Sequence, residues 1–295
     1  GVMITASHNP PAYNGVKLVG PDGVELSRST LDRIEERLAA TDFETVGWAE
    51  VGQAERIDGA DDDYVDGVVA AIDRETIAAA DLTVVVDPGH GAGCHTSPQF
   101  LRKLGCTVHT VNAQPDGHFP GRDPEPVDQH LGDLQEYVRS TDADLGIAHD
   151  GDADRAIFVD ETGATINGDA ALAALVEATV EPGDTVVSAV NASQRLVDVV
   201  DAADADLTLT RIGSTYLISR IRELQADGET VSAAGEGNGG IIFPGYRIAR
   251  DGAYSAGTFL ELVADEPASE IAARFDDYAN VRRTVAYDDD GERSA

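Results

Sequence analysis

Lysine is nearly absent from this chain of 295 residues, in which Lys17 and Lys103 are the only two. Acidic residues number 54 against 21 lysines and arginines, so the formal net charge is −33, and the excess is spread over the whole length. Self-repulsion at this charge destabilises a compact chain, whereas molar salt shortens the Debye length to roughly 3 Å and screens the repulsion. We therefore expect a protein of a high-salt cytoplasm, with an ordinary acidic protein as the alternative, and no binding to nucleic acid or membrane.

Cysteine and long apolar runs are also scarce. Cys94 and Cys106 lie too far apart for a Cys-x-x-Cys motif and make no disulfide framework, which fits a reducing cytosol. No run of about 18 apolar residues is present, so no transmembrane helix is expected, and no signal peptide is visible. The chain starts at Gly1 without an initiator methionine and enters a motif at once. We therefore expect the sequence to lack its true beginning.

Apolar strand-like segments alternate with helical segments along most of the chain. Leu82–Val86 is almost continuously apolar, which is typical of a parallel strand covered on both faces. A helix beginning at Ser97 and a strand over residues 107–111 follow it, and the same alternation continues from residue 168 to a last long helix after Gly252. This pattern predicts an α/β fold of doubly wound sheets, whose ligands bind at the carboxyl ends of the strands.

Three carboxylates alternate in the loop Asp150-Gly-Asp-Ala-Asp-Arg155, between two apolar strand-like segments. Acidic side chains at alternate positions can converge on one hard divalent cation, and a solvated acidic loop is the plainer alternative. An EF-hand calcium loop is disfavoured, because its sixth position needs glycine and holds Arg155, and because the flanks are not helical.

A glycine-rich turn, Asp87-Pro-Gly-His-Gly-Ala-Gly93, follows the first of the buried strands. Such a turn could cradle a phosphate, but a tight strand-to-helix turn is the favoured interpretation. The glycine pattern Gly-x-Gly-x-x-Gly is absent, which also disfavours a dinucleotide-binding oxidoreductase.

Residues 5–15 carry the turn signals Asn-Pro, Pro-Pro and Asn-Gly, which predict a tight loop between two short strands. Within this loop Ser7 is a candidate nucleophile, although an isolated serine needs a base or a good electrophile. His8 is expected to orient the loop by a hydrogen bond, because sequence neighbours rarely form a serine–histidine dyad. Lys17 is the better candidate for proton transfer or phosphate contact.

Taken in order, these loops resemble the motifs of the α-D-phosphohexomutases, which include phosphomannomutase, phosphoglucosamine mutase and phosphoglucomutase. The matching stretches cover nearly the whole chain and are residues 5–17, 87–93, 150–155, 235–240 and 250–252. The resemblance implies three similar α/β domains around a central cleft, the first incomplete and the fourth essentially absent, in a haloarchaeal member truncated at both ends. The implied bounds are 1–75 for part of domain I, 76–168 for domain II, 169–275 for domain III and 276–295 for the start of domain IV.

The resemblance implies an Mg²⁺-dependent intramolecular phosphotransferase. Ser7 would carry a phosphoryl group and exchange it with a hexose phosphate through a hexose 1,6-bisphosphate, interconverting hexose 1-phosphate and hexose 6-phosphate. The implied metal ligands are Ser7 as phosphoserine, Asp150, Asp152 and Asp154. The implied catalytic residues are Ser7, His8, Lys17 and Arg155, and the implied substrate-binding residues are Glu236, Asn238, Arg211, Arg250 and Asp251.

The expected sugar loop departs from many members of the family, because Asn238 and Gly240 stand where they carry Ser and His. The Asn-Gly-Gly version resembles archaeal members and favours glucosamine or mannose phosphate. His118 and Arg122 are weaker candidates for ligand contacts, and the alternative for Arg122 is that it only stabilises its proline-rich loop. Small sugar phosphates are the expected partners of a cytoplasmic monomer or homodimer. The alternative function is a non-catalytic relative that binds hexose phosphate or a divalent cation.

Overall fold

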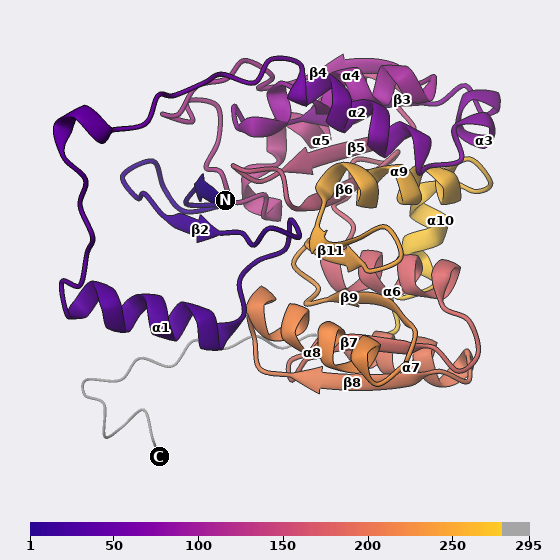
Figure 1. Cartoon of the computed structure of the whole chain (residues 1–295). Coiled ribbons are helices and arrows are strands. Elements are labelled where there is room, and N and C mark those ends of the chain that lie inside the picture. The colour runs from indigo at the N-terminus through magenta and orange to yellow at the C-terminus, as the bar shows by residue number, and fades with distance from the viewer. Residues whose placement is uncertain (279–295) are drawn as a thin grey trace, which may run out of the picture.

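The structure is a computed structural model, and it describes residues 1–278. Two α/β units are stacked on each other, and the N-terminal segment lies along one side of both (Figure 1). The segment expected to open a fourth domain lies outside the described residues from position 279 onward. None of the described helices is long and apolar enough to cross a membrane.

The first unit contains a four-stranded sheet in the order β4-β3-β5-β6. β3 pairs in parallel with β4 and β5, whereas β6 runs antiparallel to β5. Every residue of β5 and β6 is buried, as the continuous apolar runs predicted. The elements are α2 (Ala60–Ala70), α3 (Arg74–Ala79), β3 (Thr83–Asp87), α4 (Ser97–Leu104), β4 (Thr107–Thr110), α5 (Gly132–Thr141), β5 (Leu145–His149) and β6 (Ala156–Asp160).

The second unit contains a five-stranded sheet in the order β11-β10-β9-β7-β8. β7, β8 and β9 are parallel, and β10 and β11 continue the sheet in antiparallel register. The elements are α6 (Gly168–Thr179), β7 (Thr185–Ala189), α7 (Gln194–Ala202), β8 (Asp206–Thr210), α8 (Ser214–Ala226), β9 (Val231–Gly235), β10 (Ile241–Phe243), β11 (Arg247–Arg250), α9 (Gly252–Val263) and α10 (Ala268–Ala273).

One apolar cluster joins the two units. It includes Val84 from the first sheet, Val186 from the second, and buried side chains of α6 and α9 between them. Phe158 of β6 and Phe259 of α9 stack with their ring centroids 4.1 Å apart. α9 is buried on nearly all sides, which explains its almost uniformly apolar sequence. The loops of the two units are therefore held in fixed relation to each other.

The N-terminal segment contributes a two-stranded antiparallel sheet and one helix. β1 (Val2–Ile4) pairs with β2 (Val16–Leu18), and a bridge between Val19 and Glu25 closes a second turn at residues 21–23. α1 (Arg28–Ala39) is capped by Ser27, whose side chain accepts from the Thr30 N–H. Every residue of α1 is at least partly exposed. A turn of 3-10 helix (Trp48–Glu50) lies in the connection to α2.

Candidate active site

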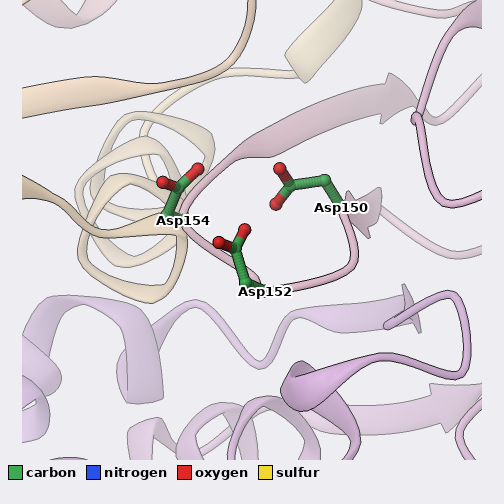
Figure 2. A group of neighbouring side chains, drawn as sticks. All are labelled: Asp150, Asp152 and Asp154. Carbon is green, nitrogen blue, oxygen red and sulfur yellow. The ribbon is translucent and has the colours of Figure 1, made fainter. Parts of the chain in front are cut away.

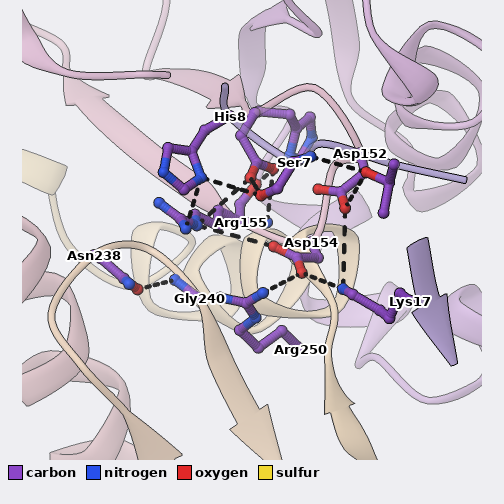
Figure 3. Close-up of polar contacts among 12 residues, drawn as sticks. Ser7, His8, Lys17, Asp152, Asp154, Arg155, Asn238, Gly240 and Arg250 are labelled. Atoms are coloured by element: carbon purple, nitrogen blue, oxygen red, sulfur yellow. Dashed lines mark hydrogen bonds and ion pairs between the residues drawn. The ribbon is translucent and has the colours of Figure 1, made fainter. Parts of the chain in front are cut away.

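The candidate site forms where three loops and the end of β11 meet at the junction of the two units (Figure 3). The acidic loop follows β5, and the Ser7 loop joins β1 to β2. A third loop joins β9 to β10, and Arg250 ends β11. Two of these loops follow the carboxyl ends of parallel strands, where ligands of doubly wound sheets bind.

The acidic loop turns its three carboxylates toward one space (Figure 2). One oxygen from each of Asp150, Asp152 and Asp154 can be chosen so that all three lie within 4.8 Å of one another. A tight turn produces this convergence: the Ala153 N–H donates to the Asp150 carbonyl at 3.1 Å, and Ala153 has a φ of 59°. We call residues 150–155 the metal loop from here on.

Glycine allows the Ser7 loop to approach the metal loop closely. A Cβ on Gly151 would lie only 2.3 Å from the Ser7 carbonyl oxygen, so no other residue fits without displacing the loop. On its other side, the Gly151 carbonyl accepts a hydrogen bond of 2.9 Å from the Ala92 N–H in the glycine-rich turn after β3. That turn therefore supports the metal loop, in line with its interpretation as a tight turn.

The electrostatics of the metal loop fit a divalent cation. Asp150 is fully buried, and burial, followed by the charges of Asp154 and Asp152, raises its pKa to about 7, although Arg155 acts in the opposite direction. One buried oxygen of Asp152 and one of Asp154 have no hydrogen-bond partner among the described residues. Converging carboxylate oxygens with unsatisfied lone pairs are the donor set that Mg²⁺ and Ca²⁺ prefer.

Ser7 faces the metal loop directly. Its Oγ donates a hydrogen bond of 3.1 Å to Asp150 Oδ2. Thr5 helps to hold this arrangement, because its Oγ1 accepts from the Ser7 N–H at 2.9 Å and donates to Asp152 Oδ2 at 2.8 Å. Ser7 itself has a φ of 54°, an unusual left-handed conformation for serine that is often found at functional sites. Sequence reasoning missed the role of Thr5.

His8 contacts Ser7 despite being its neighbour in sequence. The distance from Ser7 Oγ to His8 Nδ1 is 3.2 Å, because the left-handed turn at Ser7 brings the two side chains to the same side. This contact is compatible with the expected orienting role of His8, and its catalytic role stays a prediction. Arg155 Nη2 lies 3.0 Å from the same Nδ1. Burial, followed by the charge of Arg155, lowers the pKa of His8. The neutral Nδ1 can accept from Arg155 Nη2, while the single hydrogen of the Ser7 hydroxyl is donated to Asp150.

Three cationic side chains border the metal loop. Lys17 Nζ lies 3.3 Å from Asp154 Oδ2, and Arg250 Nη2 lies 2.6 Å from the same oxygen. Arg155 Nε lies 3.5 Å from Asp150 Oδ2. Lys17 Nζ also lies 3.6 Å from Glu25 Oε1. The bridge between Val19 and Glu25 brings these two residues together, so the sequence alone did not indicate this contact. A groove of about 920 Å³, lined by Ser7, Lys17 and Arg250 among others, provides space for a ligand beside these charges.

The predicted sugar loop after β9 also lies near the metal loop. The Gly239 carbonyl accepts from the Ala156 N–H at 3.0 Å, which ties this loop to the start of β6. Asn238 Oδ1 accepts from the Gly240 N–H at 3.1 Å (Figure 3). Glu236 Oε1 accepts from the Gly213 N–H at 2.6 Å, which leaves its second oxygen for a ligand.

The other predicted ligand contacts have different surroundings. Arg211 is exposed, and its guanidinium lies 6.0 Å from the ring centre of Tyr216. Asp251 is buried and caps α9, accepting from two backbone N–H groups and from the Tyr64 hydroxyl at 2.8 Å. The structure therefore gives Asp251 a capping role, and its contact with substrate stays a prediction. His118 is exposed and bonds to Asp116 within its own loop.

A serine hydroxyl beside a partly buried cluster of carboxylates, bordered by cationic side chains, defines an α/β protein suited to metal-assisted phosphoryl transfer. Family models described as phosphoglucomutase/phosphomannomutase α/β/α domains I, II and III match residues 1–45, 62–163 and 167–278. The chain belongs to the phosphoglucomutase/phosphomannomutase family.

Individual relatives agree with this assignment. The chain is 42% identical over 266 residues to a probable phosphoglucosamine mutase of Methanocella arvoryzae, covering 90% of this chain and 57% of the relative. It is 40% identical, with the same coverage, to a phosphoglucomutase/phosphomannomutase of Thermococcus kodakarensis. The crystal structure of a putative phosphomannomutase from Thermus thermophilus superposes with a TM-score of 0.81 at 26% identity, covering 93% of this chain and 62% of that one. The chain thus spans less than two thirds of the length of these relatives.

Proposed function

We propose that this chain carries the phosphoryl-transfer centre of a phosphohexomutase, which interconverts hexose 1-phosphate and hexose 6-phosphate. The observation that carries the proposal is the Ser7 hydroxyl, 3.1 Å from Asp150 in a cluster of converging carboxylates. Glucosamine phosphate or mannose phosphate is the proposed substrate, supported by the names of the relatives and by the Asn-Gly-Gly sequence at residues 238–240.

Ser7 is the proposed acceptor of the phosphoryl group. Its Oγ forms a bond to phosphorus of a hexose 1,6-bisphosphate, the bond from that phosphorus to the sugar oxygen breaks, and the sugar oxygen takes up a proton. Asp150 Oδ2 and His8 Nδ1 lie 3.1 and 3.2 Å from Ser7 Oγ, so either can take the serine proton as the new bond forms. In the reverse transfer, phosphorylated Ser7 gives its phosphoryl group to the free hydroxyl of a hexose monophosphate, at C1 or C6, and forms the 1,6-bisphosphate. When that bisphosphate next donates its other phosphoryl group to Ser7, the isomeric monophosphate is released.

The three aspartates are the proposed ligands of Mg²⁺, together with an oxygen of phosphorylated Ser7. When bound, the cation neutralises charge on the transferring phosphoryl group. Within the chain, Asp150 receives hydrogen bonds from Ser7 Oγ and from the Arg155 N–H at 3.2 Å, which fix its carboxylate relative to the serine. One buried oxygen each of Asp152 and Asp154, which accepts no hydrogen bond from the described residues, is available as a further ligand.

The remaining side chains bind and orient the sugar phosphate in this proposal. Arg155 is positioned to contact phosphoryl oxygens next to Ser7, and Lys17 and Arg250 hold positive charge at the opposite side of Asp154. Glu236 and Asn238 are the proposed contacts to sugar hydroxyls, since a carboxylate can accept two hydrogen bonds and an amide can both donate and accept. Arg211 is the proposed outer phosphate contact.

The test is phosphorylation of Ser7. The chain is incubated with glucose 1,6-bisphosphate and Mg²⁺ in molar KCl and then analysed by intact mass and peptide mapping. We expect one added phosphoryl group on Ser7, lost in Asp152→Ala and retained in Ser140→Ala, which changes an exposed serine of α5. A folded chain that binds Mg²⁺ but takes up no phosphoryl group would instead be a non-catalytic relative, and phosphorylation at another residue would contradict the assignment of Ser7.

A further inference from the structure

A buried ion pair lies directly behind the metal loop. Arg122 Nε and Asp87 Oδ2 are 2.8 Å apart, and the two residues are only 8% and 1% exposed. Removing two charges from water costs several kcal/mol per ion, so a buried pair is weak evidence for a purely stabilising role. Neither residue lines the groove beside Ser7, so the pair has no direct contact with a ligand in that groove.

The guanidinium of Arg122 donates to three backbone carbonyl groups in addition to its ion pair with Asp87. Nη2 donates to the His149 carbonyl at 2.6 Å and to the Asp87 carbonyl at 3.1 Å, and Nη1 donates to the Asp123 carbonyl at 3.0 Å. The His149 carbonyl belongs to the peptide bond that leads into Asp150. Because the guanidinium is planar and rigid, these contacts fix the direction in which the chain enters the metal loop.

Asp87 is in turn held in one orientation. Its Oδ1 accepts from the Gly89 N–H at 2.8 Å, and the Asn112 amide lies 3.3 Å from both of its oxygens. Gly89 leaves room for the arginine, since a Cβ there would lie 2.6 Å from Arg122 Nη2. The same turn donates from Ala92 to the Gly151 carbonyl. The backbone of the metal loop is thus fastened immediately before and immediately after Asp150.

We propose that Arg122, oriented by Asp87, is a positioning residue for the cation site: it acts through the His149 carbonyl to aim Asp150 at the common space of the three carboxylates. The proposal rests on the function proposed above, because it requires the metal loop to bind a cation. Groups that orient metal ligands without touching the metal typically change metal affinity by 10- to 100-fold when they are altered.

The chain offers a matched control. Arg139 of α5 also donates to a backbone carbonyl, that of Gly163 at 3.2 Å, but this carbonyl lies in the turn after β6 and far along the chain from Asp150. Arg122→Lys keeps the charge beside Asp87 and removes the fork that reaches three carbonyl groups. Arg139→Lys makes the same chemical change outside the cation site.

The experiment measures Mn²⁺ binding by EPR in molar KCl, with thermal unfolding as a check of the fold. We expect Arg122→Lys to weaken Mn²⁺ binding by roughly 10- to 100-fold and Arg139→Lys to leave it unchanged. Folded Arg122→Lys with an affinity within about twofold of the parent would overturn the inference. If Arg122→Lys does not fold, Asp87→Asn, which keeps the shape of the side chain, is judged by the same criterion.

The same data separate this inference from the proposed function. Asp152→Asn tests the cation site itself. If Mn²⁺ binding by the parent chain does not depend on Asp152, the proposed cation site is wrong, and so is the positioning role of Arg122. If the parent binds Mn²⁺ through Asp152 and Arg122→Lys binds equally well, only the positioning role is wrong.

Discussion

Asp150→Asn is expected to stabilise the metal-free chain above neutral pH while removing its response to Mg²⁺. Asp150 has a pKa of about 7 in the folded chain, against 3.8 for an ordinary aspartate, because it is buried and lies beside Asp154 and Asp152. Between pH 4 and 7 the folded chain therefore holds a proton on this group that the unfolded chain has lost, so its stability falls as the pH rises through this window. Above pH 7 the buried carboxyl group is ionised in the folded chain. The ionisation then lowers the unfolding free energy by on the order of 4 kcal/mol, from the difference between the two pKa values.

The assay is urea unfolding in EDTA and molar KCl at several pH values from 5 to 8. Asparagine keeps an oxygen that can accept from Ser7 Oγ, but it cannot ionise. The difference in unfolding free energy between variant and parent should therefore grow in favour of the variant from pH 5 to pH 8. Added Mg²⁺ should stabilise the parent and not the variant. Asp265→Asn, at an exposed position, serves as the control and should show neither effect.

A stability difference between Asp150→Asn and the parent that does not change with pH would contradict this prediction, and so would a variant less stable than the parent at pH 8. Either result would mean that neighbouring groups already balance the negative charge of Asp150 in the metal-free chain. Because the group is buried, molar salt screens these effects much less than it screens surface charges.

Three further predictions concern the surroundings of the site. Gly151→Ala should abolish phosphorylation of Ser7, measured by mass spectrometry, because its Cβ would lie 2.3 Å from the Ser7 carbonyl oxygen; normal phosphorylation would show that the two loops can separate. Tyr64→Phe should lower the unfolding free energy by roughly 1.5–3 kcal/mol, since it removes a hydrogen bond to charged Asp251, and Mn²⁺ affinity by EPR should not change. Phe158→Ala should cost about 3–5 kcal/mol by urea unfolding, because the ring is buried in the core shared by both units; a cost below 1 kcal/mol would contradict that packing.

Much of the fold could be predicted from local patterns. The strands at 83–87 and 107–110 and the start of α4 at Ser97 were found within a residue or two of their expected positions, because apolar runs and helix starts are local signals. The short helices α3 and α10 and the strand β11 were not predicted. Each of α3 and α10 has only six residues, too few to show a helical period, and β11 is a strand because it pairs with β10.

The candidate site was predictable to a different extent. The spacing of the aspartates in the metal loop was enough to predict their convergence, because the loop is continuous in sequence. The contact between Ser7 and Asp150 joins residues 143 positions apart, so only the family resemblance could suggest it. The left-handed turn at Ser7 and the pairing of Asp87 with Arg122 depend on how loops pack, and no local pattern indicates them. For Asp251, by contrast, an N-cap signal was present, since aspartate directly preceded a helical segment.

The core shared by the two units has a mechanical consequence for the proposed reaction. Separating the two units would expose apolar side chains of the cluster that they share, and moving the metal loop away from the loop at residues 238–240 would break the hydrogen bond between Ala156 and Gly239. In the proposed reaction we therefore expect these two walls of the site to keep their spacing. A bisphosphate that must present first one phosphate and then the other to a single serine has to rotate between fixed walls, so the ligand, and not this part of the protein, is the moving part.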